Sequence, residues 1–193
     1  MSNLIAKIKE LKPDVNIFAV GDDWQSINGF AGSSLEYFNN FAKYFDGAEI
    51  LSMNTNYRSK SAIVEFGNNL FETGEKAKSS QIGGQVIEIK NLDEVLSSIS
   101  KDRKIAILVR NNYEKKEINI SKYKELNIEI MTAHKSKGLQ FDDVIIYQNS
   151  FQKIHPDNKF FEFFGKTEQE LSAEEKRLFY VAVTRAKENL YIL

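Results

Sequence analysis

Short apolar runs alternate along this chain with segments of helical spacing, and this alternation restricts the fold more than any other feature. Each run has the length of one buried strand, and helices between successive strands are typical of βαβ units. The sequence therefore predicts an α/β fold with a mainly parallel sheet and flanking helices. The expected strands are residues 15–20, 49–53, 85–89, 105–109, 128–131, 144–147 and 190–193.

Apolar residues recur at helical spacing between these strands. Ser59 or Ser61 is expected to cap the start of the helix at residues 59–71. The aromatic-rich stretch 30–45 is expected to be irregular or helical, and the polar stretch 76–84 to be an exposed connection. The expected helices are residues 4–11, 59–71, 92–99 and 168–181.

Composition excludes several classes of protein. The formal net charge of −1 argues against a generally basic nucleic-acid binder, although local basic patches remain compatible with it. The absence of cysteine excludes disulfides and thiolate metal sites, and it fits a reducing cytoplasm. His134 and His155 lie too far apart in sequence to suggest zinc, so no metal site is expected. No apolar run approaches the roughly 20 residues that cross a bilayer, and no signal peptide is visible. We expect a soluble cytoplasmic protein without a membrane partner.

The stretch 130–143, IMTAHKSKGLQFDD, places polar side chains between two expected strands. Thr132, His134, Ser136 and Lys137 can hydrogen-bond or ion-pair with phosphates. Gly138 lets the backbone approach a ligand, because it has no side chain. Polar residues anchored between buried strands in this way indicate a binding loop, although His134 taken alone fits a structural histidine equally well.

The stretch 20–33, VGDDWQSINGFAGS, follows an expected strand. Asp22 and Asp23 lie where ligands gather in parallel sheets and could hold magnesium, but a turn with two solvated acids is the favoured interpretation. Trp24 and Phe30 could stack on bases. Considered singly, both aromatic residues fit a place in the core better.

Two further clusters carry arginine. In NTNYRS, residues 54–59, Tyr57 can cover a flat heterocycle and Arg58 can bind a phosphate, although exposed Tyr-Arg pairs are common. In EEKRLFYVAVTRAK, residues 174–187, Arg185 follows an apolar run. Such a position suits an arginine finger on a transferred phosphoryl group, and an exposed arginine without a role is the commoner alternative.

The order of these clusters is far more specific than any one of them. GDDWQSI, NYRS, MTAHKSKGLQFD and EEKRLFYVAVTRAK follow one another as motifs III to VI do in UvrD/Rep-type superfamily 1 DNA helicases. The resemblance spans roughly residues 15–193 and is nearest to the helicase IV branch, where the wording GDDWQSI is characteristic. A short gap between residue 109 and the IMTAH motif adds to the likeness.

The resemblance implies an ATP site with Mg²⁺ in the intact protein, formed between two RecA-like domains of the P-loop NTPase type. By match of motif, Gln25 would sense the γ-phosphate, Tyr57 would stack on adenine, and Arg58 and Arg185 would contact the γ-phosphate. Gly138 would lie close to the nucleotide in the same site. Gln140 stands where the family has a glutamate, so ribose recognition would rely on an amide.

The resemblance also implies binding to single-stranded DNA and to duplex junctions. Thr132, His134 and Lys137 would contact the DNA backbone, and Phe30 would stack on a base. Asn28 and Ala31 replace a tyrosine and an arginine of the family pattern, which weakens the expected contacts beside Phe30.

The chain resembles the C-terminal part of such a helicase. It contains no GxxxxGK[ST] loop, and no DExx box precedes residue 15. The tripeptide Gly165-Lys166-Thr167 is a chance match, because Phe160 replaces the first glycine of that loop. We expect residues 1–55 to be the end of the first RecA-like domain, carrying motif III, and residues 56–193 to be the second, carrying motifs IV to VI.

The expected function is that of a piece of an ATP-dependent DNA helicase, a DNA-repair type of enzyme, with 3′-to-5′ movement implied by the family. The rest of the first RecA-like domain would be its partner, and the isolated chain would be inactive. A naturally truncated, non-catalytic protein that binds single-stranded DNA or regulates a helicase is the alternative. A module in which the motif residues serve only packing is a second alternative.

Overall fold

The computed structural model describes residues 2–28, 35–45, 47–72, 74–147, 151 and 168–193. The chain divides into two compact units, Met1–Ser52 and Met53–Leu193. The expected domain boundary at residue 55 and the assignment of two RecA-like domains stay predictions. Within the described ranges, no helix combines the length and the apolar character needed to cross a membrane.

The first unit contains short helices and extended segments. Its helices are α1 (Ser2–Leu11), the 3₁₀ turn η1 (Asp23–Gln25), α2 (Glu36–Asn39) and α3 (Phe41–Tyr44). The strands expected at residues 15–20 and 49–53 are not formed, and this prediction was wrong. A strand needs a neighbour for its backbone N–H and C=O groups, and the described residues of this unit offer none. Phe18 and Val20 are consequently 92% and 79% exposed.

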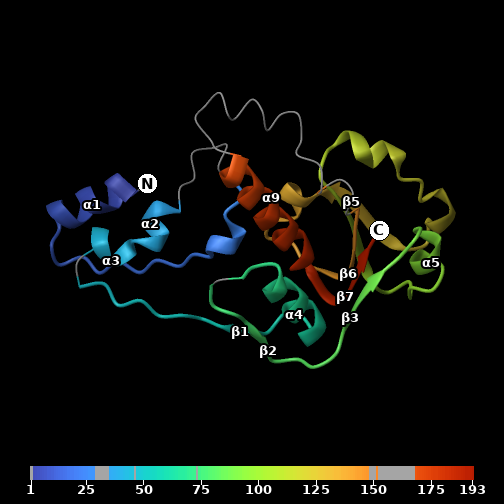
Figure 1. Ribbon diagram of the computed structural model, residues 1–193, viewed down its shortest axis with the longest axis horizontal. Coiled ribbons are helices and arrows are strands. Elements are labelled where there is room, and N and C mark those ends of the chain that lie inside the picture. Colours follow the sequence, from blue (N-terminus) through green and yellow to red (C-terminus); the bar gives the residue numbers. More distant parts are fainter. Residues whose placement is uncertain (1, 29–34, 46, 73, 148–150, 152–167) are drawn as a thin grey trace. The chain divides into compact units, whose positions relative to one another are not determined.

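The second unit is built on a five-stranded sheet whose neighbouring strands all pair in parallel (Figure 1). The predicted α/β fold with a mainly parallel sheet is therefore confirmed. The strand order is β3-β7-β6-β4-β5. Their bounds are β3 (Gln85–Glu88), β4 (Lys104–Val109), β5 (Asn127–Thr132), β6 (Phe141–Ile146) and β7 (Ala186–Ile192).

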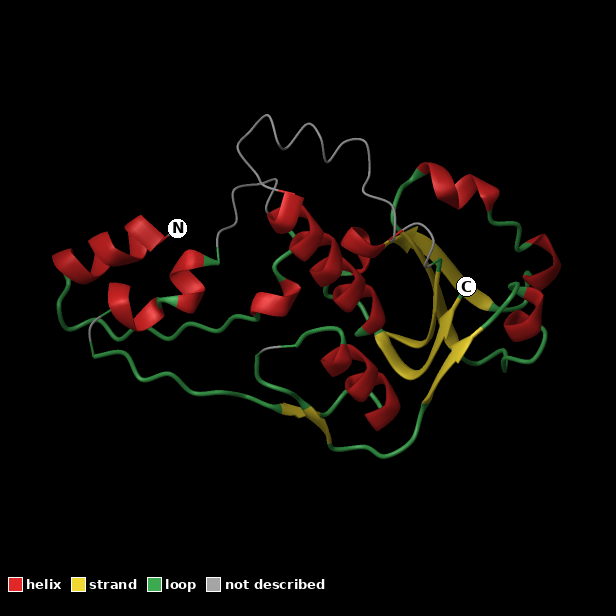
Figure 2. Ribbon diagram, viewed as in Figure 1, coloured by secondary structure: helices red, strands yellow, loops and turns green. Residues whose placement is uncertain are grey.

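Helices cover both faces of this sheet (Figure 2). On one face, Val95 and Leu96 pack with the alternating residues Ile105, Ile107 and Val109 of β4 in one apolar cluster. The elements on that side are α5 (Asp93–Leu96) and the 3₁₀ turns η3 (Tyr113–Glu117) and η4 (Ser121–Tyr123). On the other face, α4 contacts β3 and β7, and α9 contacts β6 and β7. These two helices are α4 (Ser61–Asn69) and α9 (Glu168–Val183).

Two local expectations need correction. The polar stretch 76–84 is not wholly a loop, because β2 (Lys78–Ser79) pairs in parallel with β1 (Thr55–Asn56). Lys60 occupies the N-cap of α4 and makes no side-chain capping bond. Ser59 does not cap the helix because its hydroxyl donates to the carbonyl of Ala186, 2.7 Å away.

A buried carboxylate near the amino edge of the sheet connects β6 with β7 and with the residue just before β4. Asp143 in β6 is fully buried. The guanidinium of Arg103 binds it through both Nε and Nη2, the latter at 2.8 Å, and the amide of Asn189 donates to it at 2.9 Å. The hydrogen bond to this carboxylate raises the pKa of Arg103 above its ordinary value. A charge inside the sheet is tolerated because several partners replace its water.

Arg103→Ala should lower the free energy of unfolding by about 3 kcal/mol, because it leaves the Asp143 carboxylate buried without its cation. Urea denaturation measures this loss. Adding Asp143→Asn to that variant should recover part of it, since the neutral amide can still bond Asn189. Lys122→Ala is the matched control, because Lys122 pairs with Asp93 in solvent and its loss should cost under about 0.5 kcal/mol. Equal losses for the two single variants would contradict a structural role for the buried pair.

Two adjacent glycines before β3 provide a second test. A Cβ on Gly84 would lie 2.6 Å from both the Glu188 carbonyl oxygen and the Lys60 Cβ, whereas one on Gly83 would meet nothing within 4 Å. Both residues have positive φ, +78° and +109°, so alanine is strained at either position. Gly84→Ala should therefore unfold at least about 1 kcal/mol more easily than Gly83→Ala in urea. A smaller loss for Gly84→Ala would show that α4, β3 and β7 do not approach this closely.

Candidate nucleotide and nucleic-acid site

Arg185 lies between the end of α9 and the start of β7, and its side chain points inward. It is 2% exposed. Its Nε donates to the Val181 carbonyl at 2.8 Å, and its Nη2 donates to the Thr184 hydroxyl at 3.1 Å. Nη1 donates to the Leu139 carbonyl at 3.2 Å. The last carbonyls of a helix have no partner in the helix and carry partial negative charge, so they attract a cation.

The alternative that Arg185 is an exposed arginine without a role is therefore wrong for this structure. A contact with a γ-phosphate stays a prediction. The backbone around Arg185 nevertheless joins segments that lie far apart in sequence. Its carbonyl accepts from the N–H of Phe141 at 3.0 Å, and the Lys187 carbonyl accepts from the N–H of Lys60 at 2.8 Å. Together with the Ser59–Ala186 bond, these contacts bring three motif segments to the amino edge of β6 and β7.

The NYRS segment is held in a turn by one amide. The Oδ1 of Asn56 accepts from the backbone N–H groups of Arg58 and Ser59, both at 2.9 Å. The Gln81 side chain donates to the Tyr57 carbonyl at 2.7 Å. Tyr57 itself is 74% exposed, and Arg58 is half-buried. The turn thus presents a large aromatic surface to solvent beside a partly covered guanidinium.

The segment from Thr132 to Gln140 crosses from one edge of the sheet to the other. Thr132 ends β5 and caps α6 (Ala133–Ser136), its Oγ1 accepting from the N–H of Lys135 at 3.4 Å. His134 is half-buried, and Lys137 is exposed. Gly138 has φ +88°, a conformation that favours glycine. Gln140 is exposed immediately before β6.

The direction of the strands separates the candidate residues into two groups. Thr132 and His134 lie where β5 ends, at the carboxyl edge of the sheet. Arg185 and Gln140 lie just before β7 and β6 begin, at the amino edge, and Arg58 lies beside them through Ser59. The structure therefore brings Arg58, Gln140 and Arg185 to one edge, and it places Thr132 and His134 on the opposite edge. The roles of these residues stay predictions.

Acids and cations are paired at the amino edge. The Lys187 ammonium lies 2.6 Å from a carboxylate oxygen of Asp142, and the Lys104 N–H donates to the same carboxylate at 2.9 Å. Burial raises the pKa of Asp142, but the Lys104 N–H and the Lys187 ammonium outweigh it, so the pKa lies below its ordinary value. This carboxylate therefore remains charged at neutral pH and holds Lys187 at the start of β7.

The candidate residues of the first unit are described separately. Gln25 ends η1, and its amide donates to the carboxylate of Asp22. Asp22 also caps η1 by accepting from the N–H of Trp24 at 3.0 Å. Asp22 is therefore hydrogen-bonded within its own turn. Phe30 lies outside the described residues.

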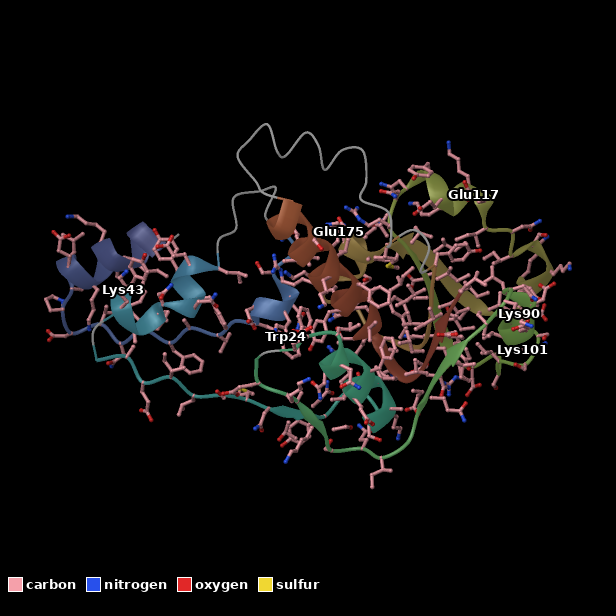
Figure 3. The ribbon with its side chains drawn as sticks, viewed as in Figure 1. Trp24, Lys43, Lys90, Lys101, Glu117 and Glu175 are labelled. Carbon is pink, nitrogen blue, oxygen red and sulfur yellow. The ribbon has the colours of Figure 1, made fainter. Side chains whose placement is uncertain are left out.

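Sequence reasoning missed an ion pair that fixes α9. The Arg110 guanidinium binds both carboxylate oxygens of Glu175 at 2.8 and 2.6 Å, and each side chain is 16% exposed. Figure 3 labels Glu175 on α9. Arg110 directly follows β4, so the pair ties the carboxyl edge of the sheet to this helix. Its members lie 65 residues apart, and no local pattern could have paired them. Asn56 was also missed, although Asn is typical of turns that bind their own backbone.

Comparison with known proteins supplies the family. A family model described as the UvrD-like helicase C-terminal domain matches residues 119–193. DNA helicase IV of Escherichia coli is 30% identical over 212 residues, covering 98% of this chain and 31% of that protein. A probable DNA helicase of Mycoplasma pneumoniae is 25% identical over 210 residues, covering 92% of this chain and 38% of that protein. DNA helicase II of Escherichia coli is 36% identical over 78 residues, covering 38% of this chain and 11% of that protein.

This chain spans less than two fifths of the length of each of these relatives. The matched region contains the segment of Thr132 to Gln140, helix α9 and Arg185, which the geometry places in one connected structure. The chain belongs to the UvrD-like DNA helicases, and residues 119–193 match their C-terminal domain.

Proposed function

We propose that this chain is the C-terminal part of an ATP-dependent DNA helicase, which moves along single-stranded DNA and couples ATP hydrolysis to duplex unwinding. Its movement would be 3′ to 5′, as the family resemblance implies. The observation that carries the proposal is the meeting of three motif segments at one edge of the sheet, at the Ser59–Ala186 and Phe141–Arg185 contacts. These segments are distant in sequence, and their meeting at one edge is the arrangement expected of residues that bind one ligand together.

The amino edge suits a nucleoside triphosphate. Tyr57 offers an exposed ring for adenine, and the half-buried guanidinium of Arg58 suits the charge of a terminal phosphate. The guanidinium of Arg185 donates to internal acceptors in this structure, so it would have to turn outward to join Arg58 there. Gln140 can hydrogen-bond a ribose hydroxyl, and Gly138 allows the backbone to lie close to the ligand. ATP would supply the phosphoryl group whose charge these arginines bind. Gln25 of the first unit would sense that phosphate and couple its presence to DNA binding.

The residues of this chain do not complete an ATP site. The sequence has no GxxxxGK[ST] loop for the β-phosphate. Across the described ranges, no cluster of three acidic or histidine side chains could hold Mg²⁺. We infer that the phosphate loop and the magnesium ligands come from the remainder of the first RecA-like domain, which is the partner of this edge.

The carboxyl edge suits the DNA backbone. The hydroxyl of Thr132, the imidazole of His134 and the ammonium of Lys137 are groups that bind phosphate oxygens. Phe30, which belongs to the first unit, is proposed to stack on a base of the DNA. A non-catalytic protein that binds single-stranded DNA would use this same edge, so the two candidate functions differ in hydrolysis and not in DNA binding.

Binding of a fluorescein-labelled oligo-dT to this chain should weaken steeply with salt, because phosphate contacts release counterions. Fluorescence anisotropy measures the affinity at several salt concentrations. Lys137→Ala should reduce the slope of log affinity against log salt by about 0.7, the value for one phosphate contact on a single strand. Lys101→Ala is the matched control, since Lys101 is an exposed lysine before β4 at the opposite edge. Equal slopes for the two variants would contradict a phosphate contact at Lys137.

The isolated chain should release no inorganic phosphate from ATP above the rate of a buffer blank, with or without oligo-dT. The physical reason is that the arginines alone leave the β-phosphate and Mg²⁺ without ligands. A coupled phosphate-release assay measures this rate. Turnover that Arg58→Lys abolishes would contradict the proposed division of the ATP site between this chain and the rest of a helicase.

A further inference from the structure

One exposed aromatic side chain lies outside the family motifs at the carboxyl edge of the sheet. Tyr113 begins η3 and is 56% exposed. Val109, the last residue of β4, pairs in register with Thr132, the last residue of β5. Neighbouring strands lie about 4.8 Å apart, so the chain leaves both strands at nearly the same place. The turn of Tyr113 therefore begins four residues after the point where β4 ends next to Thr132.

The turn that carries Tyr113 is fixed at both ends. Before it, the Arg110–Glu175 pair binds the chain to α9, and the N–H of Asn111 donates to the Glu114 carboxylate at 2.7 Å. After it, Ile118 is buried in the apolar cluster under β4. A ring on an anchored turn loses little conformational freedom when it binds a flat partner.

Tyr123, ten residues later on the same side of the chain, shows what a structural tyrosine does here. Its ring packs against the apolar cluster, and its hydroxyl donates to the Asp93 carboxylate at 2.5 Å. Tyr113 is instead an exposed residue. Its hydroxyl accepts from the Asn111 amide at 3.4 Å, a contact at the chain's surface. An exposed, oriented ring is the group that single-strand binding proteins use to stack on bases.

Exposed cations accompany this ring at the same edge. Lys116 follows Tyr113 in η3, and Lys135 and Lys137 follow Thr132. Aromatic groups interleaved with cations match the chemistry of a single strand, whose phosphates need charge and whose bases need a flat surface. An acidic peptide would use the lysines but would gain nothing specific from the ring.

We propose that Tyr113 is a base-stacking residue for single-stranded nucleic acid, and that it extends the surface formed by Thr132, His134 and Lys137. This inference rests on the proposed function, and it adds a base contact to a surface otherwise made of phosphate contacts. Because every base has a π-face, the contact tolerates any sequence. The stack forms on the second unit, independently of Phe30 in the first.

The test compares Tyr113→Ala and Tyr113→Phe with the parent chain, using anisotropy with labelled oligo-dT. Tyr113→Ala should weaken binding about 5-fold or more, the loss of one stacked base, and Tyr113→Phe should bind as the parent does. The slope against salt should be the same for all three proteins, because no phosphate contact is lost. Ile82→Ala, which removes a side chain that is 93% exposed elsewhere in the second unit, should bind as the parent does.

A series of oligonucleotides with one abasic site each locates the stacked base. At one position the abasic site should weaken the parent chain and leave Tyr113→Ala unchanged, so that the two proteins become equal. Tyr113→Trp gives an independent reading, because its added fluorescence should be quenched by DNA relative to the parent, whose one tryptophan is Trp24.

The outcomes separate this inference from the proposed function. A parent chain that binds no oligo-dT at low salt overturns both. A parent chain that binds, with Tyr113→Ala equal to it at every abasic position and no quenching in Tyr113→Trp, overturns only the stacking role. Weaker binding by Tyr113→Ala with a reduced salt slope would also overturn it, because the loss would then be electrostatic.

Discussion

The buried guanidinium of Arg185 connects the elements on which the candidate site depends. It binds the last turn of α9 through Val181 and Thr184 and the loop before β6 through Leu139. A charged side chain this far from water is stable only with acceptors around it, and carbonyl oxygens at the end of a helix provide them. The same residue's backbone carbonyl receives the first N–H of β6. The carboxyl end of α9 is thus held against β6 and β7 at this residue.

Because the strands are parallel, the residues proposed to bind nucleotide and those proposed to bind DNA lie at opposite edges of the sheet. The amino edge collects Arg58, Gln140 and Arg185, and the carboxyl edge collects Thr132, His134 and Tyr113. Residues 132–141 join the edges, since they begin at the end of β5 and finish at the start of β6. The Arg110–Glu175 pair ties α9 to the carboxyl edge as well. A shift of α9 would therefore move residues at both edges. Binding of one proposed ligand could in this way change the binding of the other.

The sheet of the second unit was predictable because its strands are apolar runs of buried length, and β4 and β6 are almost wholly buried. The same rule failed for residues 15–20 and 49–53, since an apolar run becomes a strand only beside a partner. The nearness of Arg58 and Arg185 followed from the family resemblance, whereas the inward course of the Arg185 side chain did not. Whether a guanidinium meets solvent or helix carbonyls depends on the loop at Leu139, which lies 46 residues away.

The roles of individual residues are less accessible to sequence than the fold is. Thr132 was predicted as a DNA contact, and the structure shows that its hydroxyl also caps α6. Capping and phosphate binding both need an exposed oxygen at the end of a strand, so the residue type cannot distinguish them. Arg110 and Glu175 belong to segments that local patterns treat separately. Such pairs become visible only when the sheet brings the end of β4 against α9.

The central claim is that the residues that bind DNA and the residues that bind the nucleotide lie on opposite edges of one sheet. The most direct test follows the backbone amide NMR resonances of the chain during titration with oligo-dT in the absence of nucleotide. The two-edge arrangement predicts that the largest changes occur at Thr132–Lys137 and around Tyr113, with Asn56–Ser59 and Ala186 nearly unchanged. Changes centred on Asn56–Ser59 and Ala186, with residues 132–137 unaffected, would contradict it.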